Sequence, residues 1–227
     1  MPAPLSVIVP TLNAATELPL CLESLMPGLE AGLIREVIIA DGGSDDATVK
    51  IAGAMGATVV TGARGRGAQL AAGAAAARGD WLLFLHADTA LSRDWAERSG
   101  DHIVTRPDYA AFFELHFRSD ARAARGLEKR ANRRARMLGL PYGDQGLLIP
   151  RKLYDEAGGY RDVPLMEDVM LVRAVGKRRL VQLNAEARTS AAKYERDGWN
   201  RRSFRNAVLI TRFLLGAKPE TLARHYT

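Results

Sequence analysis

Apolar runs rich in β-branched residues alternate with helix-like segments through the first 90 residues of this chain. The runs 6–10, 36–41, 57–62 and 80–88 are predicted to be strands. Between them, 17–29 and 44–56 are predicted helices, and 67–79 is an alanine-rich one. This order is typical of an α/β fold with a doubly wound, mainly parallel sheet. A ligand of such a sheet lies at the carboxyl ends of its strands.

The second half of the chain is less regular. A strand is predicted over 109–119 and a long basic helix over 121–138. A short strand then precedes a turn at Gly158–Gly159, a helix begins near 166, and an amphipathic helix covers 200–215. Because no internal repeat or clean linker is visible, we predict one domain over 1–227 with a helical C-terminal extension.

Charge is unevenly divided along the chain. The net charge is +6, but residues 1–100 hold 7 Lys and Arg against 11 Asp and Glu (−4), and residues 101–227 hold 25 against 15 (+10). A basic half favours a phosphorylated small molecule, an anionic lipid surface or nucleic acid as partner. Nucleic acid is not expected, because the basic residues lack interleaved aromatic side chains for base stacking.

Features that report on cellular setting are few. The single cysteine, Cys21, excludes an intramolecular disulfide and is expected to be buried among leucines. The first residues lack the pattern of a signal peptide, and no stretch approaches the roughly 18 apolar residues of a spanning helix. We expect a cytoplasmic protein, with peripheral contact to the inner face of a membrane through its basic helices as an open alternative.

The first predicted strand ends in PTLN, residues 10–13. Pro10 ends the hydrogen-bonding ladder, and Thr11 and Asn13 offer short polar side chains where a base or ribose could bind. A turn that leads into a helix cap is the alternative.

The second predicted strand ends in ADGGSDDAT, residues 40–48. Asp41 could accept hydrogen bonds from a base or ribose, and Gly42 would allow a ligand to approach the backbone closely. Alternatively, this is a strand–turn–helix junction in which Ser44 caps a helix with Asp45 and Asp46 in its first turn.

ARGRGAQ, residues 63–69, places two arginines among glycines at a helix entrance. Backbone amides, the helix dipole and the Arg66 guanidinium would together form a cradle for a diphosphate. A surface loop with solvated arginines explains the segment equally well.

FLHADT, residues 84–89, brings a histidine and an aspartate to the end of a buried strand. Asp88 could bind a hard divalent cation whose other ligands are phosphate oxygens, and it could also be a helix cap. His86 is expected on the same face of the strand, either as a softer ligand that favours manganese over magnesium or as a group that orients another ligand.

Two motifs in the second half offer further carboxylates. PLMEDVMLV places Glu167 and Asp168 at a helix start, where the dipole stabilises a carboxylate whether or not it acts as a general base. PYGDQG places Asp144 and Gln145 in a glycine-flanked turn that could meet a sugar or an acceptor, or could be purely structural.

Basic residues form a stripe along the predicted helix over 121–138. They are Arg122, Arg125, Lys129, Arg133 and Arg136. A solvated face is the default interpretation, and binding of a phosphorylated acceptor or an anionic membrane is the alternative. At the start of the last helix, Arg201, Arg202 and Arg205 could close over a diphosphate.

Taken together, these motifs resemble glycosyltransferase family 2, the nucleotide-sugar enzymes with the GT-A fold. They follow the order of the family over residues 5–180: SVIVPTLN, VIIADGGSDDAT, GRGAQLAAGAAAARGDWLLFLHADT, PYGDQGLLIPRKLYDEAGGY and LMEDVML. The forms DGGS, FLHADT, PYGDQG and LMEDV, with the C-terminal tail, resemble a bacterial subgroup linked to arsenosugar biosynthesis.

The resemblance implies a role for each motif. Arg66 would approach the diphosphate of a sugar donor, and Asp88, with His86, would bind Mn²⁺ or Mg²⁺ as the remnant of the DxD motif of the family. Asp168 would take the proton from the acceptor hydroxyl as it attacks the anomeric carbon, which gives inversion. The metal would offset the charge of the leaving nucleoside diphosphate. The nucleoside, expected to be uridine, would lie against Pro10, Thr11, Asn13, Asp41, Gly42 and Ala87.

The resemblance also divides the domain: residues 1–100 would bind the nucleotide sugar, 101–198 the acceptor, and 199–227 would form a C-terminal helix and tail. Three positions depart from the family: Ala14 replaces a common Glu, for which Glu17 could substitute, His86 replaces the first Asp of DxD, and Met170 replaces an acidic residue. A nucleotidyltransferase acting on a sugar phosphate, and a non-catalytic module that binds anionic ligands or membranes, remain as alternatives.

Overall fold

The N-terminal half forms a block of parallel strands in the computed structural model, which describes residues 3–62 and 64–224. The strands are β1 (Leu5–Thr11), β2 (Ile34–Asp41), β3 (Thr58–Thr61) and β4 (Trp81–Phe84). They pair in parallel in the order β3-β2-β1-β4. Four parallel strands in this half are therefore confirmed, and the carboxyl ends of β1 and β2 lie side by side.

The helices that connect these strands are shorter than the sequence patterns predict. They are α1 (Leu18–Glu23), α2 (Met26–Glu30), α3 (Thr48–Ala54) and α4 (Arg66–Ala76). The predicted helix over 17–29 is divided in two because Pro27, in the first turn of α2, cannot donate a helical hydrogen bond to the preceding turn. The prediction that Ser44 opens a helix is wrong, since α3 begins at Thr48, whose backbone N–H donates to the Asp46 carboxylate at 2.9 Å.

The fourth strand ends earlier than predicted. β4 keeps its register with β1 only to Phe84, and β5 (Thr89–Leu91) pairs antiparallel with β8 (Leu180–Thr189) at the far edge of the sheet. His86 and Asp88 therefore lie in the loop between β4 and β5, not on one face of a strand as predicted.

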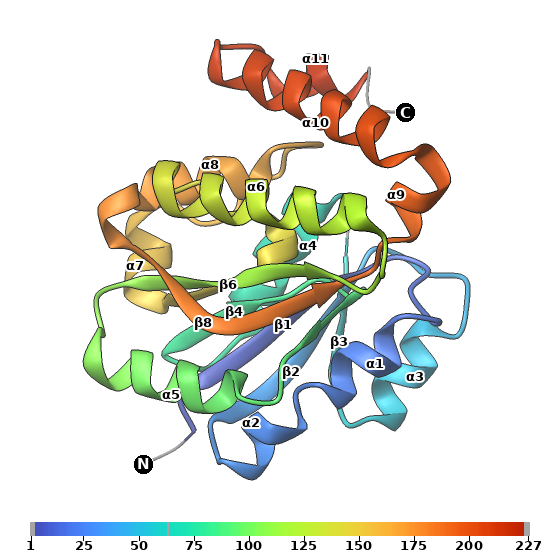
Figure 1. Cartoon of the computed structure of the whole chain (residues 1–227). Coiled ribbons are helices and arrows are strands. Elements are labelled where there is room, and N and C mark those ends of the chain that lie inside the picture. Colours follow the sequence, from blue (N-terminus) through green and yellow to red (C-terminus); the bar gives the residue numbers. More distant parts are fainter. Residues whose placement is uncertain (1–2, 63, 225–227) are drawn as a thin grey trace.

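The second half completes one mixed, mainly parallel sheet. β7 (Leu147–Pro150) pairs antiparallel with both β4 and β6 (Ala110–Phe117), and β6 pairs in parallel with β8. The full order among the described residues is β3-β2-β1-β4-β7-β6-β8-β5. The central strands β1, β4, β7 and β6 are almost entirely buried, and helices lie on both faces of the sheet (Figure 1).

Helices cover the sheet in two layers (Figure 1). α1, α2, α3 and α5 (Trp95–Thr105) lie on one face, and α4, α6 (Arg122–Leu138) and α8 (Glu167–Val175) lie on the other. Above the second layer, α10 (Trp199–Leu214) and α11 (Pro219–Ala223) form the C-terminal extension. The remaining helical segments are α7 (Arg151–Glu156), α9 (Ala192–Asp197) and the 3₁₀ turns η1 (Gly143–Gln145) and η2 (Lys177–Arg179).

The longest strand, β8, is absent from the sequence-based prediction, as is α5. A signal for β8 is nevertheless present, because apolar residues and Thr189 are buried at every second position from Leu183 while most residues between them are charged or polar. The basic run just before Leu180 obscures this alternation.

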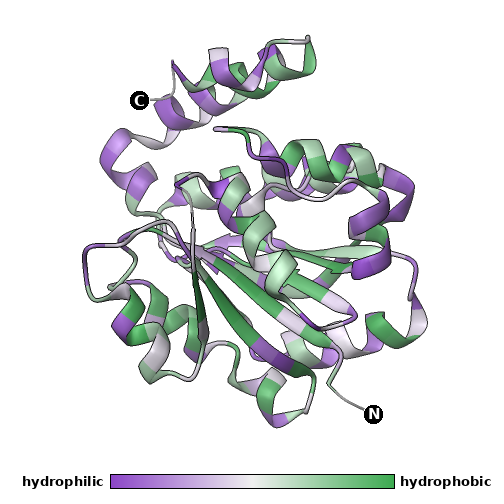
Figure 2. Ribbon diagram, turned by 180° about the vertical axis from the view of Figure 1, so that it is seen from behind, coloured by the Kyte–Doolittle hydropathy of each residue, from purple (hydrophilic) through white to green (hydrophobic). Residues whose placement is uncertain are grey.

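The two largest of three apolar clusters among the described residues lie on opposite faces of the sheet. Leu5, Val7 and Val9 of β1 point toward the cluster that contains Trp95, and Ile8 points to the opposite cluster with Phe84. The alternation along β1 explains how one strand contributes to both layers. Figure 2 shows the strands at the centre of the molecule as hydrophobic over most of their length.

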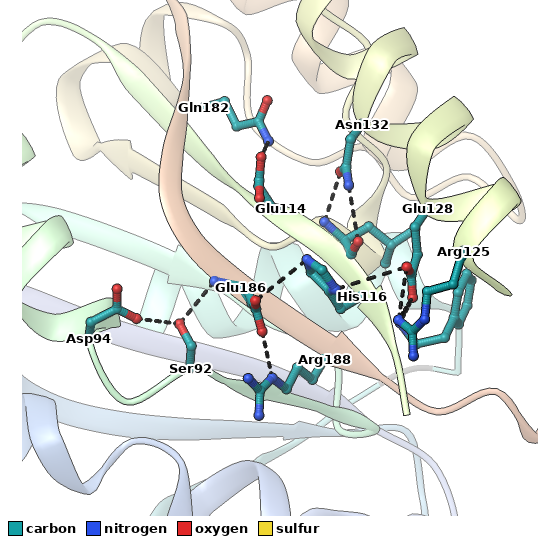
Figure 3. Close-up of polar contacts among 12 residues, drawn as sticks. Ser92, Asp94, Glu114, His116, Arg125, Glu128, Asn132, Gln182, Glu186 and Arg188 are labelled. Carbon is teal, nitrogen blue, oxygen red and sulfur yellow. Dashed lines mark hydrogen bonds and ion pairs between the residues drawn. The ribbon is translucent and has the colours of Figure 1, made fainter. Parts of the chain in front are cut away.

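Polar side chains of α6 bond to the backbone at the carboxyl end of β6. Glu128 accepts a hydrogen bond from the Phe117 backbone N–H at 2.7 Å, and Asn132 bonds to both backbone groups of Leu115 at 2.8 and 3.1 Å. On the outer side, His116 lies between Glu128 and Glu186, with ring nitrogens 3.9 and 3.6 Å from their carboxylates (Figure 3). This network fixes α6 against β6.

Candidate functional site

A cavity of about 170 Å³ opens at the carboxyl end of β4 and is covered by α9 and α10. One wall is charged and comes from six separate parts of the chain. The other wall is mostly apolar and includes Leu209 and Ile210 of α10. The polar and charged side chains that line the cavity are Arg66, His86, Asp88, Asp144, Glu167, Asp168, Thr189, Ser190, Lys193, Arg202 and Asn206.

Asp41 lies next to Thr11 at the ends of β1 and β2, as predicted. One oxygen of its carboxylate accepts from the Thr11 hydroxyl at 2.8 Å and the Ser44 hydroxyl at 2.6 Å. The other oxygen accepts from the backbone N–H groups of Gly43 and Ser44 at 2.9 and 2.8 Å. Burial would raise the pKa of Asp41, but these hydrogen bonds outweigh it and lower the pKa below its usual value.

Asn13 joins the two strand-end corners. Its backbone N–H donates to the Ser44 hydroxyl at 2.8 Å, and its side-chain oxygen accepts from the Asp45 backbone N–H at 3.0 Å. Asn13 has a φ of 52°, in the left-handed region that asparagine tolerates better than most residues. Pro10 is half-buried opposite Ala40. The structure thus brings the PTLN and ADGGS motifs together.

Gln69 of α4 is a structural residue of this corner that the sequence analysis missed. Its buried amide donates to the backbone carbonyls of Thr11 at 2.6 Å and Ala40 at 2.9 Å. A Cβ at Gly42 would lie 3.0 Å from the Gln69 amide nitrogen, so Gly42 is required for this close approach. The glycine that we predicted for ligand access therefore also has a packing role.

Arg66 opens α4, and its guanidinium lies 3.5 Å from Glu167 at the edge of the cavity. Gly67 faces the segment 161–163, where an added Cβ would lie 2.1 Å from the Arg161 carbonyl oxygen. The glycine after Arg66 is thus explained by packing against that segment. The guanidinium, which lines the cavity, is the part of the predicted cradle that a ligand could reach.

Asp88 is held by both its backbone and its side chain. Its carbonyl oxygen accepts from the Ser190 N–H at 3.0 Å and from Arg118 at 3.2 Å, and its carboxylate accepts from the Thr189 hydroxyl at 3.4 Å. Lys193 of α9 lies 3.9 Å from the same carboxylate. Arg118 also pairs with Glu17, the N-cap residue of α1, and so links that helix to the backbone of Asp88.

His86 lies beside η1, and a Cβ on Gly143 would come within 2.6 Å of its Nε2. Burial, together with nearby Arg66 and Lys193, lowers the pKa of His86 to about 3. The imidazole is therefore neutral and able to ligate a metal.

Ala87, between His86 and Asp88, packs half-buried against the core. Cys21 is buried as expected, and burial raises the pKa of its thiol to about 12.

The donor set fits a divalent cation that is held jointly with a ligand. Within residues 3–62 and 64–224 no group of three or more His, Cys, Asp or Glu side chains is arranged to enclose a metal. A neutral imidazole and a carboxylate on one loop nevertheless suit a cation that takes its other ligands from phosphate oxygens and water, and the imidazole favours Mn²⁺ over Mg²⁺. His86 and Asp88 both line the cavity and meet that description.

Asp168 lies at the start of α8, as predicted, and faces the cavity. One carboxylate oxygen accepts from the Gly143 N–H at 2.8 Å, and the other accepts from the Val169 N–H at 2.7 Å. Its neighbour Glu167 is buried; burial and the charge of Asp168 raise the pKa of Glu167, and Arg66 opposes that shift. The two adjacent carboxylates therefore have different environments.

Asp144 and Gln145 of η1 have different surroundings. Asp144 lines the cavity, and no described side chain or backbone group bonds to its buried Oδ1. Burial, reinforced by Asp168 and Asp88 and opposed by Arg134, raises the pKa of Asp144 to about 6.

Gln145 is fully buried and donates to the Phe113 carbonyl and to Asn132, both at 3.2 Å. Its position corrects the predicted ligand contact: Gln145 holds the turn in place.

Three side chains of the C-terminal segments complete the charged wall. Lys193 and Asn206 are not among the predicted site residues, because nothing in their local sequence marks them. Arg202, which is predicted, is largely buried, donates to Asp197 at 2.6 Å and lies over the ring of Tyr194 at 5.4 Å. Arg202 therefore lines the cavity from α10.

The basic stripe of α6 faces outward, away from the cavity. All five of its residues are exposed. Arg125 bonds to Glu128, and Arg136 lies 4.0 Å from Glu114. The helix is anchored through its other face, so the stripe fits the solvated interpretation.

None of the helices within 3–62 and 64–224 combines the length and apolar character needed to cross a membrane.

The order and geometry of these motifs agree with a match over residues 6–161 to the family model described as Glycosyl transferase family 2. The chain belongs to this family. The PGL/p-HBAD biosynthesis glycosyltransferases of Mycobacterium bovis and Mycobacterium tuberculosis are each 37% identical to it over 105 residues. That match covers 40% of this chain and 38% of the relatives, so it spans about two fifths of either protein.

Solved structures of GT-A glycosyltransferases share the fold of this family 2 member. S. aureus TarS 1–349 in complex with UDP superimposes with a TM-score of 0.63 at 18% identity, covering 83% of this chain and 61% of TarS. Glucosyl-3-phosphoglycerate synthase from M. tuberculosis, in complex with Mn²⁺, UDP and glucosyl-3-phosphoglycerate, gives 0.58 at 24% identity, covering 82% and 71%. The predicted GT-A fold is confirmed, and the arsenosugar subgroup stays a prediction.

Proposed function

We propose that this glycosyltransferase transfers a sugar from a UDP-linked donor to an acceptor hydroxyl with inversion at the anomeric carbon. The observation that carries the proposal is the position of Asp168. Its carboxylate faces the cavity in which His86 and Asp88 lie, with Gly143 next to both Asp168 and His86. A base and a diphosphate site in one cavity are what direct displacement requires.

Asp168 is the group that accepts the proton of the acceptor hydroxyl. The N–H groups of Gly143 and Val169 donate to its two oxygens at 2.8 and 2.7 Å, so both oxygens contact the backbone. These bonds also fix the orientation of the carboxylate, since η1 and the start of α8 hold it from two sides. As the hydroxyl oxygen attacks, the proton moves to Asp168 and the sugar–phosphate bond breaks.

The donor lies across the ends of β1, β2 and β4. The corner formed by Thr11, Asn13 and Asp41 receives the nucleoside, and Arg66 at the entrance of α4 faces the diphosphate. Support for UDP comes from the two structural neighbours described above, which are complexes with UDP. Arg202 and Lys193, from the C-terminal segments, add positive charge to the lining of the cavity.

His86 and Asp88 would hold Mn²⁺ or Mg²⁺ together with the diphosphate. When bound, such a cation offsets negative charge on the leaving diphosphate. The Mn²⁺ complexes of the mycobacterial synthase support this choice of metal. The chain contributes the neutral imidazole of His86 and the carboxylate of Asp88, both fixed by the β4–β5 loop.

The test compares Asp168→Asn with the unchanged protein for donor turnover and for UDP binding. Turnover of a UDP-sugar in the presence of Mn²⁺ should fall by at least about 100-fold, because the base is lost. UDP affinity in a calorimetric titration should stay within about threefold, because Asp168 contacts the acceptor side. Asp101→Asn, at an exposed carboxylate of α5, is the matched control. Near-normal turnover by Asp168→Asn would refute the assignment.

A parallel assay tests the nucleotidyltransferase alternative. That activity would consume a nucleoside triphosphate and a sugar phosphate and would release pyrophosphate. A glycosyltransferase releases UDP instead. Pyrophosphate release from a triphosphate at a rate above UDP release would favour the alternative.

A further inference from the structure

The helix α10 has two faces with different surroundings. Its inner face carries Leu209, which is buried, and Ile210, and both line the cavity. Its outer face looks away from the protein above the second helical layer (Figure 1). We propose that this outer face binds the surface of an anionic lipid bilayer.

Large apolar side chains are exposed along the outer face. The exposed fraction is 73% for Phe204, 38% for Val208 and 83% for Leu215. These positions are separated by four and seven residues, so they lie on one stripe of the helix. Leu214, 44% exposed, borders the stripe. Such a stripe is the part of an interfacial helix that enters the boundary between lipid headgroups and acyl chains.

Basic residues accompany the apolar stripe. Arg201 and Arg212 are exposed and follow one edge of it at helical spacing, and Lys218 and Arg224 are exposed in the segment that contains α11. Residues 199–224 contain six Arg and Lys against a single acidic residue, Glu220. A cationic border around an apolar stripe matches the negative surface potential of a membrane rich in anionic lipid.

This charge pattern favours a bilayer over the other occupants of an apolar face. A second copy of the chain would bring two basic borders together, and these like charges would repel each other. Nucleic acid would leave Phe204 and Leu215 without apolar contacts. Because the inner face of α10 lines the cavity, a bound membrane would lie close to the cavity entrance.

The experiment is co-sedimentation of the full chain with vesicles. Binding is expected to mixed phosphatidylcholine–phosphatidylglycerol vesicles and to weaken as salt is raised, with little binding to phosphatidylcholine alone. The double variant Phe204→Ser, Leu215→Ser should lose at least about tenfold in partitioning, because each lost apolar contact is worth that much or more. Arg201→Gln with Arg212→Gln should lose affinity mainly for the anionic vesicles.

The control is Val104→Ser, at a side chain that is 79% exposed on α5, distant from α10. It should bind vesicles like the unchanged protein, and thermal melts should show that all variants remain folded. Absence of binding to anionic vesicles, or equal binding by the Phe204→Ser, Leu215→Ser variant, would overturn the proposal. So would light scattering that shows a dimer abolished by the same two substitutions, or stronger binding to DNA than to vesicles.

Discussion

The ammonium group of Lys193 lies 3.9 Å from a carboxylate oxygen of Asp88. Lys193 belongs to α9 and Asp88 to the β4–β5 loop, so the contact joins the C-terminal segment to the loop that we propose as the metal site. A lysine and a divalent cation cannot both approach the same oxygens without repulsion. Lys193 therefore places a positive charge beside Asp88.

Replacement of Lys193 by Met should strengthen Mn²⁺ binding and weaken UDP binding without metal. Because the lysine side chain is 58% exposed, each effect should be modest, up to about fivefold. Calorimetric titrations with Mn²⁺, and with UDP in the presence of a chelator, measure the two changes. Lys152→Met, at an exposed lysine of α7, is the matched control. Unchanged Mn²⁺ affinity would show that Lys193 does not compete for Asp88.

Substitution of Gly143 by Ala should disable the site while the fold persists. An added Cβ would lie 2.6 Å from His86 Nε2 and 3.5 Å from an Asp168 carboxylate oxygen, so His86 must move. We expect turnover to fall by at least about tenfold, since positioning errors of this size are costly. Gly100→Ala is the matched control, because an added Cβ at Gly100 meets open space. Equal turnover of the two variants would contradict the proposed arrangement.

Loss of the Gln69 amide should weaken the packing of the strand ends that we propose to bind the nucleoside. In Gln69→Ala, two buried hydrogen bonds to the carbonyls of Thr11 and Ala40 disappear. The expected loss is about 1–2 kcal/mol of unfolding free energy, which corresponds to a fall in Tm of roughly 2–8 °C for a domain of this size. UDP affinity should fall as well. Gln182→Ala, which removes a half-buried contact with Glu114, should have the smaller effect on both quantities.

Asp144 should make the stability of the protein depend on pH. Its pKa is raised to about 6 from 3.8, so in the pH range between these values the folded state keeps a proton that the unfolded state has lost. The wild-type protein therefore loses stability as pH rises through this window. The stabilisation of Asp144→Asn relative to wild type should grow from about pH 4 to about pH 7, measured by urea unfolding. Asp101→Asn is the control, and a difference that shrinks with rising pH would contradict the burial of Asp144.

Much of the N-terminal half is predictable from local patterns. The β-branched runs over 6–10 and 36–41 predict β1 and β2 because such side chains favour buried strands. The polar corners that follow them therefore had to meet at one edge of the sheet, as Asp41 and Thr11 do. In contrast, the end of β4 at Phe84 depends on where its pairing with β1 stops.

The sequence by itself determined the α/β class, the parallel N-terminal strands and the placement of Asp88 after a buried strand and of Asp168 at a helix start. These follow from side-chain periodicity and from short motifs, which act over a few residues. Only the tertiary structure decided that Gln145 is buried, that Gln69 bonds to the carbonyls of Thr11 and Ala40, and that Lys193 lies beside Asp88. Each of these depends on contacts between segments distant in the chain, and packing and strand register, not local propensity, determine such contacts.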